Sequence, residues 1–389
     1  MKLAVFRSKL TGLVVLLGMT CAGAAAAWSA SEDDVVTALA TPDAPASTWG
    51  GLIERIQVAL RALGYDAPEG PDGPGTEAAI RAFQRDFGHA PTGQASEALL
   101  AHIDWELTNG LEATGLMFGR GLLWRIEGGP SDRPNYLFGT VHFSDPRVLA
   151  LPDAVREAFD AADTVALEVA GFEGLEADVA QSMVLNDGRT LDQIVGEALF
   201  ADVSGALARH GFGTEELRAI RPWAVYVFLT LPSAELKRAA RGIPYLDQWL
   251  EAEALRQNKQ VVGLETMEQH LAVLTGLPEA VQLAVLRSAV DYAGKTDELQ
   301  ERLIQSYLER DMAAIQQSMV EPALQSDPTI TRLFLDRLIN LRNRKIVDRA
   351  DELLREGGAF VAVGALHLPG RAGILRLLEK RGYRIERVY

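Results

Sequence analysis

The sequence predicts an α/β domain with a helical cap, preceded by a small domain of three helices. After residue 121, short apolar and β-branched runs alternate with amphipathic helical stretches, which is the order typical of an α/β domain. The preceding unit, residues 50–104, has helical periodicity only. A length of 389 residues fits this division, since domains average about 150 residues.

The composition is that of an ordinary globular protein with an acidic balance. Apolar residues make up 48% and charged residues 23%, and 38 Lys and Arg against 53 Asp and Glu give a net charge of −15. Because this field repels phosphates and anionic lipid headgroups, we expect no nucleic-acid partner and no membrane partner beyond the N-terminal segment. The single cysteine, Cys21, excludes an intramolecular disulfide and a zinc site built from cysteines.

The N-terminus has the layout of a cleavable secretory signal over residues 1–27. Basic residues precede an apolar run, and a stretch of small residues ends at Ala27. We therefore expect a periplasmic or secreted protein whose mature chain begins near Trp28. An uncleaved membrane anchor and a lipoprotein attached at Cys21 are the alternatives. Residues 28–49, rich in Ala, Pro and Ser, indicate a linker.

Residues 50–104 predict three short helices around a small core. The first ends at Gly64, the second runs from an N-cap at Thr76 to a C-cap at Gly88, and Ser96 caps the third. About 55 residues can just enclose a core of this kind.

Four segments of this unit together resemble the peptidoglycan-binding domain of the three-helix type: Ile56–Tyr65, Asp72–Gly73, Thr76–Arg85 and Thr92–Gly93. The resemblance implies that residues 50–104 bind peptidoglycan, with Tyr65 or Trp49 as the aromatic side chain against a sugar face. The loop after Gly73 is shorter than in the family, and a helical bundle without glycan binding is the alternative.

Residues 105–120 indicate a second linker, and residues 121–389 form the α/β domain. It opens with a β-hairpin, and later apolar runs predict the other strands. The expected strands are 122–127, 136–138, Thr164–Val169, Val261–Leu264, Phe360–Val363 and Tyr383–Val388. The expected helices, which form the cap in the middle of the domain, include Pro222–Leu231, Leu246–Leu255, Glu279–Val290 and Thr329–Leu354.

The sequence Gly-x-x-His follows a predicted strand twice, ending at His142 and at His367. Gly139 and Gly364 would let another backbone or a ligand approach closely where each strand ends. Open α/β sheets place their sites at such strand ends. One copy would indicate a structural histidine, whereas two copies favour a shared site.

Carboxylates in apolar surroundings are the next signal. Glu168 interrupts the buried strand Thr164–Val169, and carboxylates are seldom buried unless they are paired or bind metal; a strand-end glutamate facing solvent is the alternative. Glu265 ends the following strand in the same manner. Asp247 lies among apolar residues, where a helix N-cap is the alternative.

On the last long helix, Asn343 falls on the buried stripe and Arg342 borders it. An interior amide needs a partner, and we expect a carboxylate of the site to serve. The remaining histidines are assigned surface or structural positions: His89, His102, His210 and His270. The chain has no Gly-x-Ser-x-Gly elbow, no His-Glu-x-x-His helix and no P-loop.

Seven segments in order resemble the TraB/GumN family, which includes the Tiki metalloproteases and has ChaN-like relatives. They are Gly139–His142, Ala166–Glu168, Pro222–Trp223, Arg241–Asp247, Lys259–Thr266 with Gln269, Arg342–Asn343 and Phe360–Gly370. The resemblance implies an α/β fold in which two Gly-x-x-His histidines and a glutamate form a metal-dependent hydrolytic centre. It also implies a peptide or protein substrate and a divalent metal, Mn or Co, with Zn or Fe as other candidates.

Carried over to this chain, the family assigns His142 and His367 as metal ligands and Glu168 as a ligand or general base. Supporting catalytic roles would fall to Glu265, Asp247, Arg342 and Asn343. Imidazoles with a carboxylate suit first-row divalent ions and the activation of water. We therefore favour an exported metal-dependent hydrolase, a peptidase, located near the cell wall. The alternatives are a binding protein for iron, haem or another ligand, and a metal-free hydrolase with His142 as the base.

Overall fold

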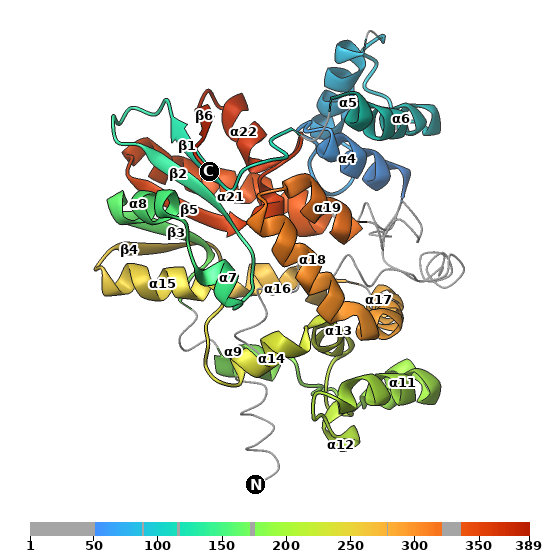
Figure 1. Ribbon diagram of the computed structural model, residues 1–389. Helices are drawn as coiled ribbons and strands as arrows, with labels where there is room; N and C mark the ends of the chain where they lie inside the picture. Colours follow the sequence, from blue (N-terminus) through green and yellow to red (C-terminus); the bar gives the residue numbers. More distant parts are fainter. Residues whose placement is uncertain (1–50, 88, 115–116, 172–175, 278, 321–335) are drawn as a thin grey trace.

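The computed structural model describes residues 51–389 except 88, 115–116, 172–175, 278 and 321–335 (Figure 1). The predicted signal and first linker, residues 1–49, lie outside the described residues, and Cys21 and Trp49 lie there with them. Within the described part of the chain, no helix combines the length and apolarity needed to cross a membrane.

A six-stranded mixed sheet forms the centre of the α/β domain, in the order β4-β3-β5-β2-β1-β6. The four strands β4, β3, β5 and β2 are parallel, and β1 runs antiparallel to both β2 and β6. The β-hairpin and the later strands predicted from the sequence are confirmed. The bounds are β1 Leu123–Glu127, β2 Asn135–Thr140, β3 Thr164–Val169, β4 Gln260–Glu265, β5 Ala359–Gly364 and β6 Arg384–Arg387.

Helices cover both faces of the sheet, which explains why its central strands β3 and β5 are apolar without alternation. On β5, Phe360 and Ala362 pack into one core with α8 (Asp153–Ala161). Val361 and Val363 pack into the other with α21 (Leu341–Glu356) and α22 (Ile374–Lys380).

The carboxyl ends of the four parallel strands lie at one edge of the sheet. Thr140 of β2 is in register with Gly364 of β5, and Val169 of β3 is in register with Glu265 of β4. This edge therefore gathers the polar residues that the sequence places directly at or after each strand.

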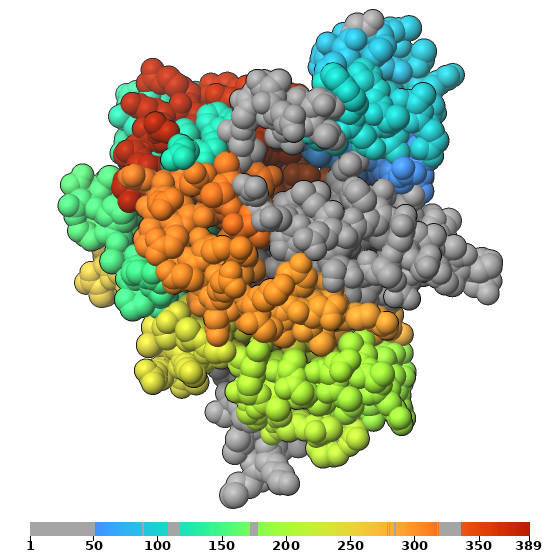
Figure 2. Space-filling model, turned by 45° about the vertical axis from the view of Figure 1, so that its right-hand side comes forward, coloured from blue at the N-terminus to red at the C-terminus, as the bar shows by residue number. Residues whose placement is uncertain are grey.

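The segment between β3 and β5 is mainly helical, as predicted for a cap. Figure 1 shows α11–α14 at the far end from the small domain, and Figure 2 shows α17–α19 (orange) between these helices and the C-terminal part of the chain (red). The bounds are α9 Glu176–Ser182, α10 Leu191–Val195, α11 Glu197–Ala208, α12 Thr214–Leu217, α13 Pro222–Thr230, α14 Ser233–Ala239, α15 Leu246–Arg256, α16 Met267–Thr275, α17 Glu279–Tyr292, α18 Thr296–Leu308 and α19 Met312–Val320.

The long helix predicted over Thr329–Leu354 is described only from residue 336 onward. Its residues 329–335 lie outside the described residues, and the described part begins with a π-helical turn, η4 (Asp336–Asn340), that continues into α21. A further short α7 (Pro146–Leu149) follows β2, and a 3-10 turn, η5 (Ala365–His367), follows β5.

The small domain consists of α4 (Leu52–Ala62), α5 (Pro74–Asp86) and α6 (Glu97–Thr114) around one apolar core. Ser96 accepts a hydrogen bond from the Leu99 N–H, as predicted for its cap. α6 extends to Thr114, through residues that the sequence assigned to a linker.

The prediction of Thr76 as an N-cap is wrong. α5 begins two residues earlier at Pro74, and the buried Thr76 hydroxyl instead accepts a hydrogen bond from the Gln57 side chain at 2.7 Å. Proline is preorganised for the first turn of a helix, so the start moves to Pro74. The predicted C-cap, Gly88, lies outside the described residues.

Candidate metal centre

The two glycines of the Gly-x-x-His segments make room for different neighbours. A Cβ on Gly139 would lie 3.1 Å from the backbone Cα of Ala365, so this glycine allows β2 and η5 to approach. A Cβ on Gly364 would lie 3.4 Å from His367 Cδ2, 3.5 Å from Glu168 Oε2 and 3.7 Å from His142 Nε2. The two strand ends therefore meet, and three predicted ligands surround Gly364.

His142 is held from one side by Asp247, the second residue of α15. The His142 Nδ1 atom lies 2.8 Å from Asp247 Oδ2, and the Thr140 hydroxyl donates to Asp247 Oδ1 at 2.7 Å. Since a carboxylate accepts, Nδ1 carries the proton and Nε2 keeps its lone pair. Asp247 is buried and does not cap its helix, whose N-cap is Tyr245.

His367 is oriented in the same way by Asn343 of α21. The amide nitrogen of Asn343 donates to the Ala372 carbonyl at 2.8 Å, so its Oδ1 faces His367 Nδ1 at 2.6 Å and accepts. Nε2 of His367 accordingly accepts from the Arg342 guanidinium at 3.3 Å. Asn343 is fully buried, as predicted, but its partner is an imidazole, not the expected carboxylate.

Glu168 is buried at 3% exposure, so the alternative of a solvent-facing strand end is wrong. Its two oxygens have different neighbours. Oε1 accepts from Arg342 Nη2, whereas Oε2 accepts from the Gly364 N–H at 3.1 Å and faces His367 Nε2 at 3.8 Å.

Glu265, at the end of β4, pairs with the same arginine. Arg342 Nη2 lies 2.5 Å from Glu265 Oε2, and Arg342 Nε lies 2.9 Å from it. His270 of α16 completes this group, because its Nδ1 is 3.1 Å from Arg342 Nη2 and 3.2 Å from Glu168 Oε1. All four side chains are buried.

Two trios are therefore candidates for a metal, and they share Glu168. Among the described residues, the trio whose ligand atoms all lie within 4.8 Å of one another is Glu168, Glu265 and His270, and not the predicted trio. Arg342 Nη2 contacts every member of that closer trio, so a guanidinium already supplies its positive charge.

The predicted trio uses the other oxygen of Glu168 and is more widely spaced. Arg342 lies beside this trio too, because its Nη1 is 3.3 Å from His367 Nε2. Glu168 Oε2 lies 3.8 Å from His367 Nε2, and two atoms bound to a common ion at 2.0–2.2 Å lie about 3–4 Å apart. His142 is the member beyond that spacing, although its Nε2 faces the same glycine. Asp247 and Asn343 supply the outer hydrogen bonds that such imidazole ligands require.

The pKa values of His367 and His142 shift in opposite directions. Burial lowers the pKa of His367 to about 4, so its imidazole is neutral at pH 7, the form that binds metal. Burial acts in the same direction on His142, but the carboxylate of Asp247 outweighs it and raises the pKa of His142.

The other side of the centre is a charged network. Burial would raise the pKa of Glu168, but Arg342 and His367 hold it well below its usual value. Burial lowers the pKa of His270, yet its hydrogen bonds to Glu168 and Glu265 raise it overall. The protonated form of His270 is thereby favoured, and in that form it donates hydrogen bonds to the carboxylates.

Sequence reasoning missed His270, which it assigned to the surface or to a structural position. The signal was present in the helical spacing, because the buried Met267 precedes it by three residues and the buried Leu274 follows it by four. Thr266 and Gln269 form a capping box that fixes the start of α16 and hence the direction of His270.

A second buried network anchors the loop that follows His142. Glu235 of α14, with no exposed surface, accepts from the Ser144 N–H at 3.0 Å and from the Ser144 hydroxyl. Gln300 of α18 donates to it at 2.6 Å, and Arg238 pairs with it. The sequence analysis did not single out any of these residues.

Comparison with known proteins matches both domains to families. The profile of the TraB/PrgY/gumN family matches residues 122–387, and that of a peptidoglycan binding domain matches residues 50–103. No solved structure matches.

Relatives cover the larger domain. The chain is 26% identical to Metalloprotease TIKI1 of Homo sapiens and 23% identical to a Metalloprotease TIKI homolog of Nematostella vectensis; each match covers 68% of this chain. These matches span 61% and 66% of the two relatives, so the chain covers less than two thirds of their length. It is also 25% identical to the protein YbaP of Shigella flexneri, over 64% of this chain and 89% of YbaP.

Proposed function

The chain belongs to the TraB/PrgY/gumN family, and on that premise we propose that it is an exported metal-dependent hydrolase, a peptidase, acting near the cell wall. The observation that carries the proposal is the convergence of His142, His367 and Glu168 around Gly364 at the carboxyl edge of the sheet. The relatives named metalloproteases support the reaction class.

In this proposal, His142 and His367 would hold a divalent ion through their imidazoles, together with the carboxylate of Glu168. When bound, such an ion would lower the pKa of a water molecule and polarise the carbonyl of a substrate. Mn or Co is the choice that family resemblance favours, and Zn or Fe suits the same donors.

The surrounding residues orient these groups. Asp247 and Asn343 fix the imidazoles through their Nδ1 atoms, so that each Nε2 points toward the centre. Arg342, which also pairs with Glu265, holds Glu168 by its Oε1 atom and leaves Oε2 toward Gly364. Glu168 can accept a proton from water only if it stays ionised, and its lowered pKa meets this condition.

Location follows from the N-terminal part of the chain. Residues 1–27 would direct export, and residues 50–104 would hold the α/β domain near peptidoglycan. The substrate class, a peptide or protein, follows from the relatives and stays part of the proposal.

Metal analysis with substitution tests the centre. We expect the chain without residues 1–27 to bind one divalent ion and, when supplemented with Mn or Co, to cleave members of a peptide library. Either His142→Ala or His367→Ala should abolish both properties, because each removes a ligand from a site of three. His89→Ala, an exposed change in the small domain, is the matched control.

A fully active His367→Ala variant would contradict the proposal. A protein that binds haem or iron with no hydrolysis would favour the binding-protein alternative. Asp247→Asn should weaken metal binding by roughly 10- to 100-fold and leave the ligands in place, as expected of an orienting residue.

A further inference from the structure

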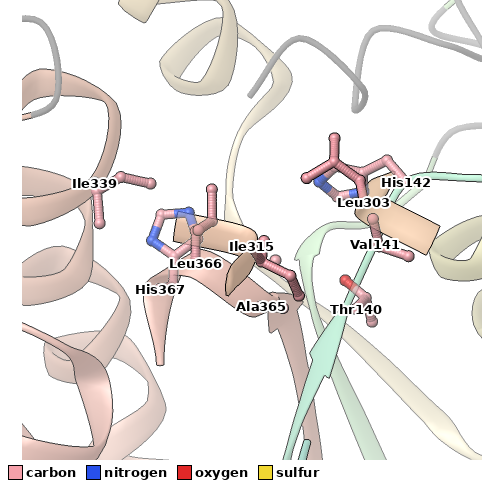
Figure 3. Close-up of a pocket in the computed structure, with 10 residues that line it drawn as sticks. Thr140, Val141, His142, Leu303, Ile315, Ile339, Ala365, Leu366 and His367 are labelled. Atoms are coloured by element: carbon pink, nitrogen blue, oxygen red, sulfur yellow. The ribbon is translucent and has the colours of Figure 1, made fainter. Parts of the chain in front are cut away.

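An apolar pocket adjoins the candidate centre. It contains about 490 Å³ of empty space, its open mouth included, and both His142 and His367 line it. In Figure 3, His367 lies near Leu366 and His142 lies near Leu303. The aliphatic lining consists of Val141, Leu303, Ile315, Ile339, Ala365 and Leu366.

The lining is more exposed than an ordinary core. Leu303 and Ile315 form a buried wall at 3% and 4% exposure, whereas Val141, Ile339 and Leu366 are only half-buried. Aliphatic side chains that stay partly wet beside a polar centre are typical of a ligand pocket.

The charged groups of the centre face elsewhere. Arg342 pairs with both Glu168 and Glu265, and none of the three lines the pocket. Among the described residues, Thr140 and the two imidazoles are the polar side chains in its lining. A charged side chain placed against the aliphatic wall would lose its water without gaining a charged partner from that wall.

We propose that this pocket binds an aliphatic side chain of the substrate, adjacent to the bond that is cleaved. The inference rests on the proposed function, because it assumes that the substrate bond is cleaved next to the two histidines. A peptide whose carbonyl lies between them would have a neighbouring side chain within reach of Ile339 and Leu366. The pocket would thus select Leu-like side chains over small or acidic ones.

Equilibrium binding in EDTA tests the pocket without catalysis. The probes are blocked pentapeptides Gly-Gly-X-Gly-Gly with X as Leu, Ala or Asp, titrated into the chain without residues 1–27. Leu has three more carbons to bury than Ala, which predicts about 50-fold tighter binding, and Asp should bind no better than Ala. Equal binding of the three peptides, or no binding up to millimolar concentration, overturns the inference.

Substitutions in the lining test whether the preference for Leu comes from this pocket. Ile339→Trp and Leu366→Trp fill the pocket from its half-buried side, and each should reduce the preference for Leu at least tenfold. Leu255→Trp makes the same kind of change at an exposed position of α15 outside the lining, and it should leave the preference unchanged. A full preference for Leu in both pocket variants would also overturn the inference.

The metal-loaded chain separates this inference from the proposed function. With Mn or Co present, kcat/KM should follow the same order, Leu above Ala above Asp. Hydrolysis with no preference for Leu would overturn the pocket and leave the peptidase proposal standing. Selective binding of the Leu peptide with no hydrolysis would overturn the peptidase proposal and support the pocket.

Discussion

The buried ion pair between the two domains gives a sharp test of the structure. Arg61 of α4 donates to Asp336 of η4 through Nε, at 3.1 and 2.9 Å to its two oxygens, and again through Nη2. Its Nη1 donates to the carbonyls of Ala67 and Pro68, each at 3.2 Å. The two paired side chains are 3% and 1% exposed.

Arg61→Ala should lower the free energy of unfolding by about 3–5 kcal/mol, the range for a buried charge left without its partner. With an unfolding entropy of roughly 2.1 cal/mol/K per residue, this loss of free energy corresponds to a fall in Tm of about 4–7 °C if the two domains unfold as one cooperative unit. Arg55→Ala is the control on the same helix, because Arg55 and Glu97 form an exposed pair at 3.6 Å. Its effect should stay within about 1 kcal/mol.

The pH dependence of Arg61→Ala provides the second part of the test. Burial raises the pKa of Asp336 above its unfolded value and Arg61 opposes this shift, so the substitution should raise that pKa further. A carboxyl with a raised folded-state pKa destabilises the fold once it ionises, and the penalty disappears as the pH falls. The variant should therefore approach the parent in Tm between pH 7.5 and pH 4.

Calorimetry at several pH values measures these effects, with Asp336→Asn added to the Arg61→Ala chain. The neutral amide should recover at least half of the loss at pH 7.5. An Arg61→Ala chain with the Tm of Arg55→Ala would contradict a stabilising buried pair. So would a difference in Tm that neither acid nor the added Asp336→Asn reduces.

Three further predictions follow from contacts elsewhere. Gly364→Ala should weaken metal binding at least tenfold in a metal titration, because the added Cβ would enter the space between the three predicted ligands. The Tm should change little, since the nearest atom would lie 3.4 Å from this Cβ. Asn135→Ala should lower the free energy of unfolding by about 1–3 kcal/mol in urea titrations, because the buried amide donates to the Leu354 carbonyl at 2.8 Å and accepts from the Ala359 N–H at 3.0 Å. The chain without residues 1–27 should sediment with purified peptidoglycan, and deletion of residues 50–104 should abolish this; equal sedimentation of the two chains would contradict a wall-binding role.

Periodicity and repetition were sufficient to predict the sheet and the edge that carries the site. Runs such as Thr164–Val169 are apolar on both faces because helices cover both sides, so their position is visible in sequence. The two Gly-x-x-His segments end neighbouring parallel strands, which explains how His142 and His367 approach each other over a long stretch of chain.

The partners of the site residues could not be predicted in the same way. Helical spacing placed Arg342 at the border of a buried face, and the family resemblance gave it a supporting role without naming its partners; in the structure it binds Glu168 and Glu265 together. Asn343 was expected to meet a carboxylate and meets His367. Helical spacing shows which side chains point inward, but their partners depend on how α21 crosses the sheet, and that angle comes from packing with the whole core.

Helix α21 and the η4 turn before it contact both the small domain and the candidate centre through neighbouring residues. Asp336 binds Arg61, and Arg344 donates to the carbonyls of Tyr65 and Ala67 in the small domain. Between them in the sequence, Arg342 and Asn343 hold Glu168 and His367. The same two turns of helix therefore anchor the small domain and orient the predicted ligands. A domain held this way keeps a fixed position relative to the centre, so a glycan strand bound to residues 50–104 would be presented at a defined distance from His142 and His367.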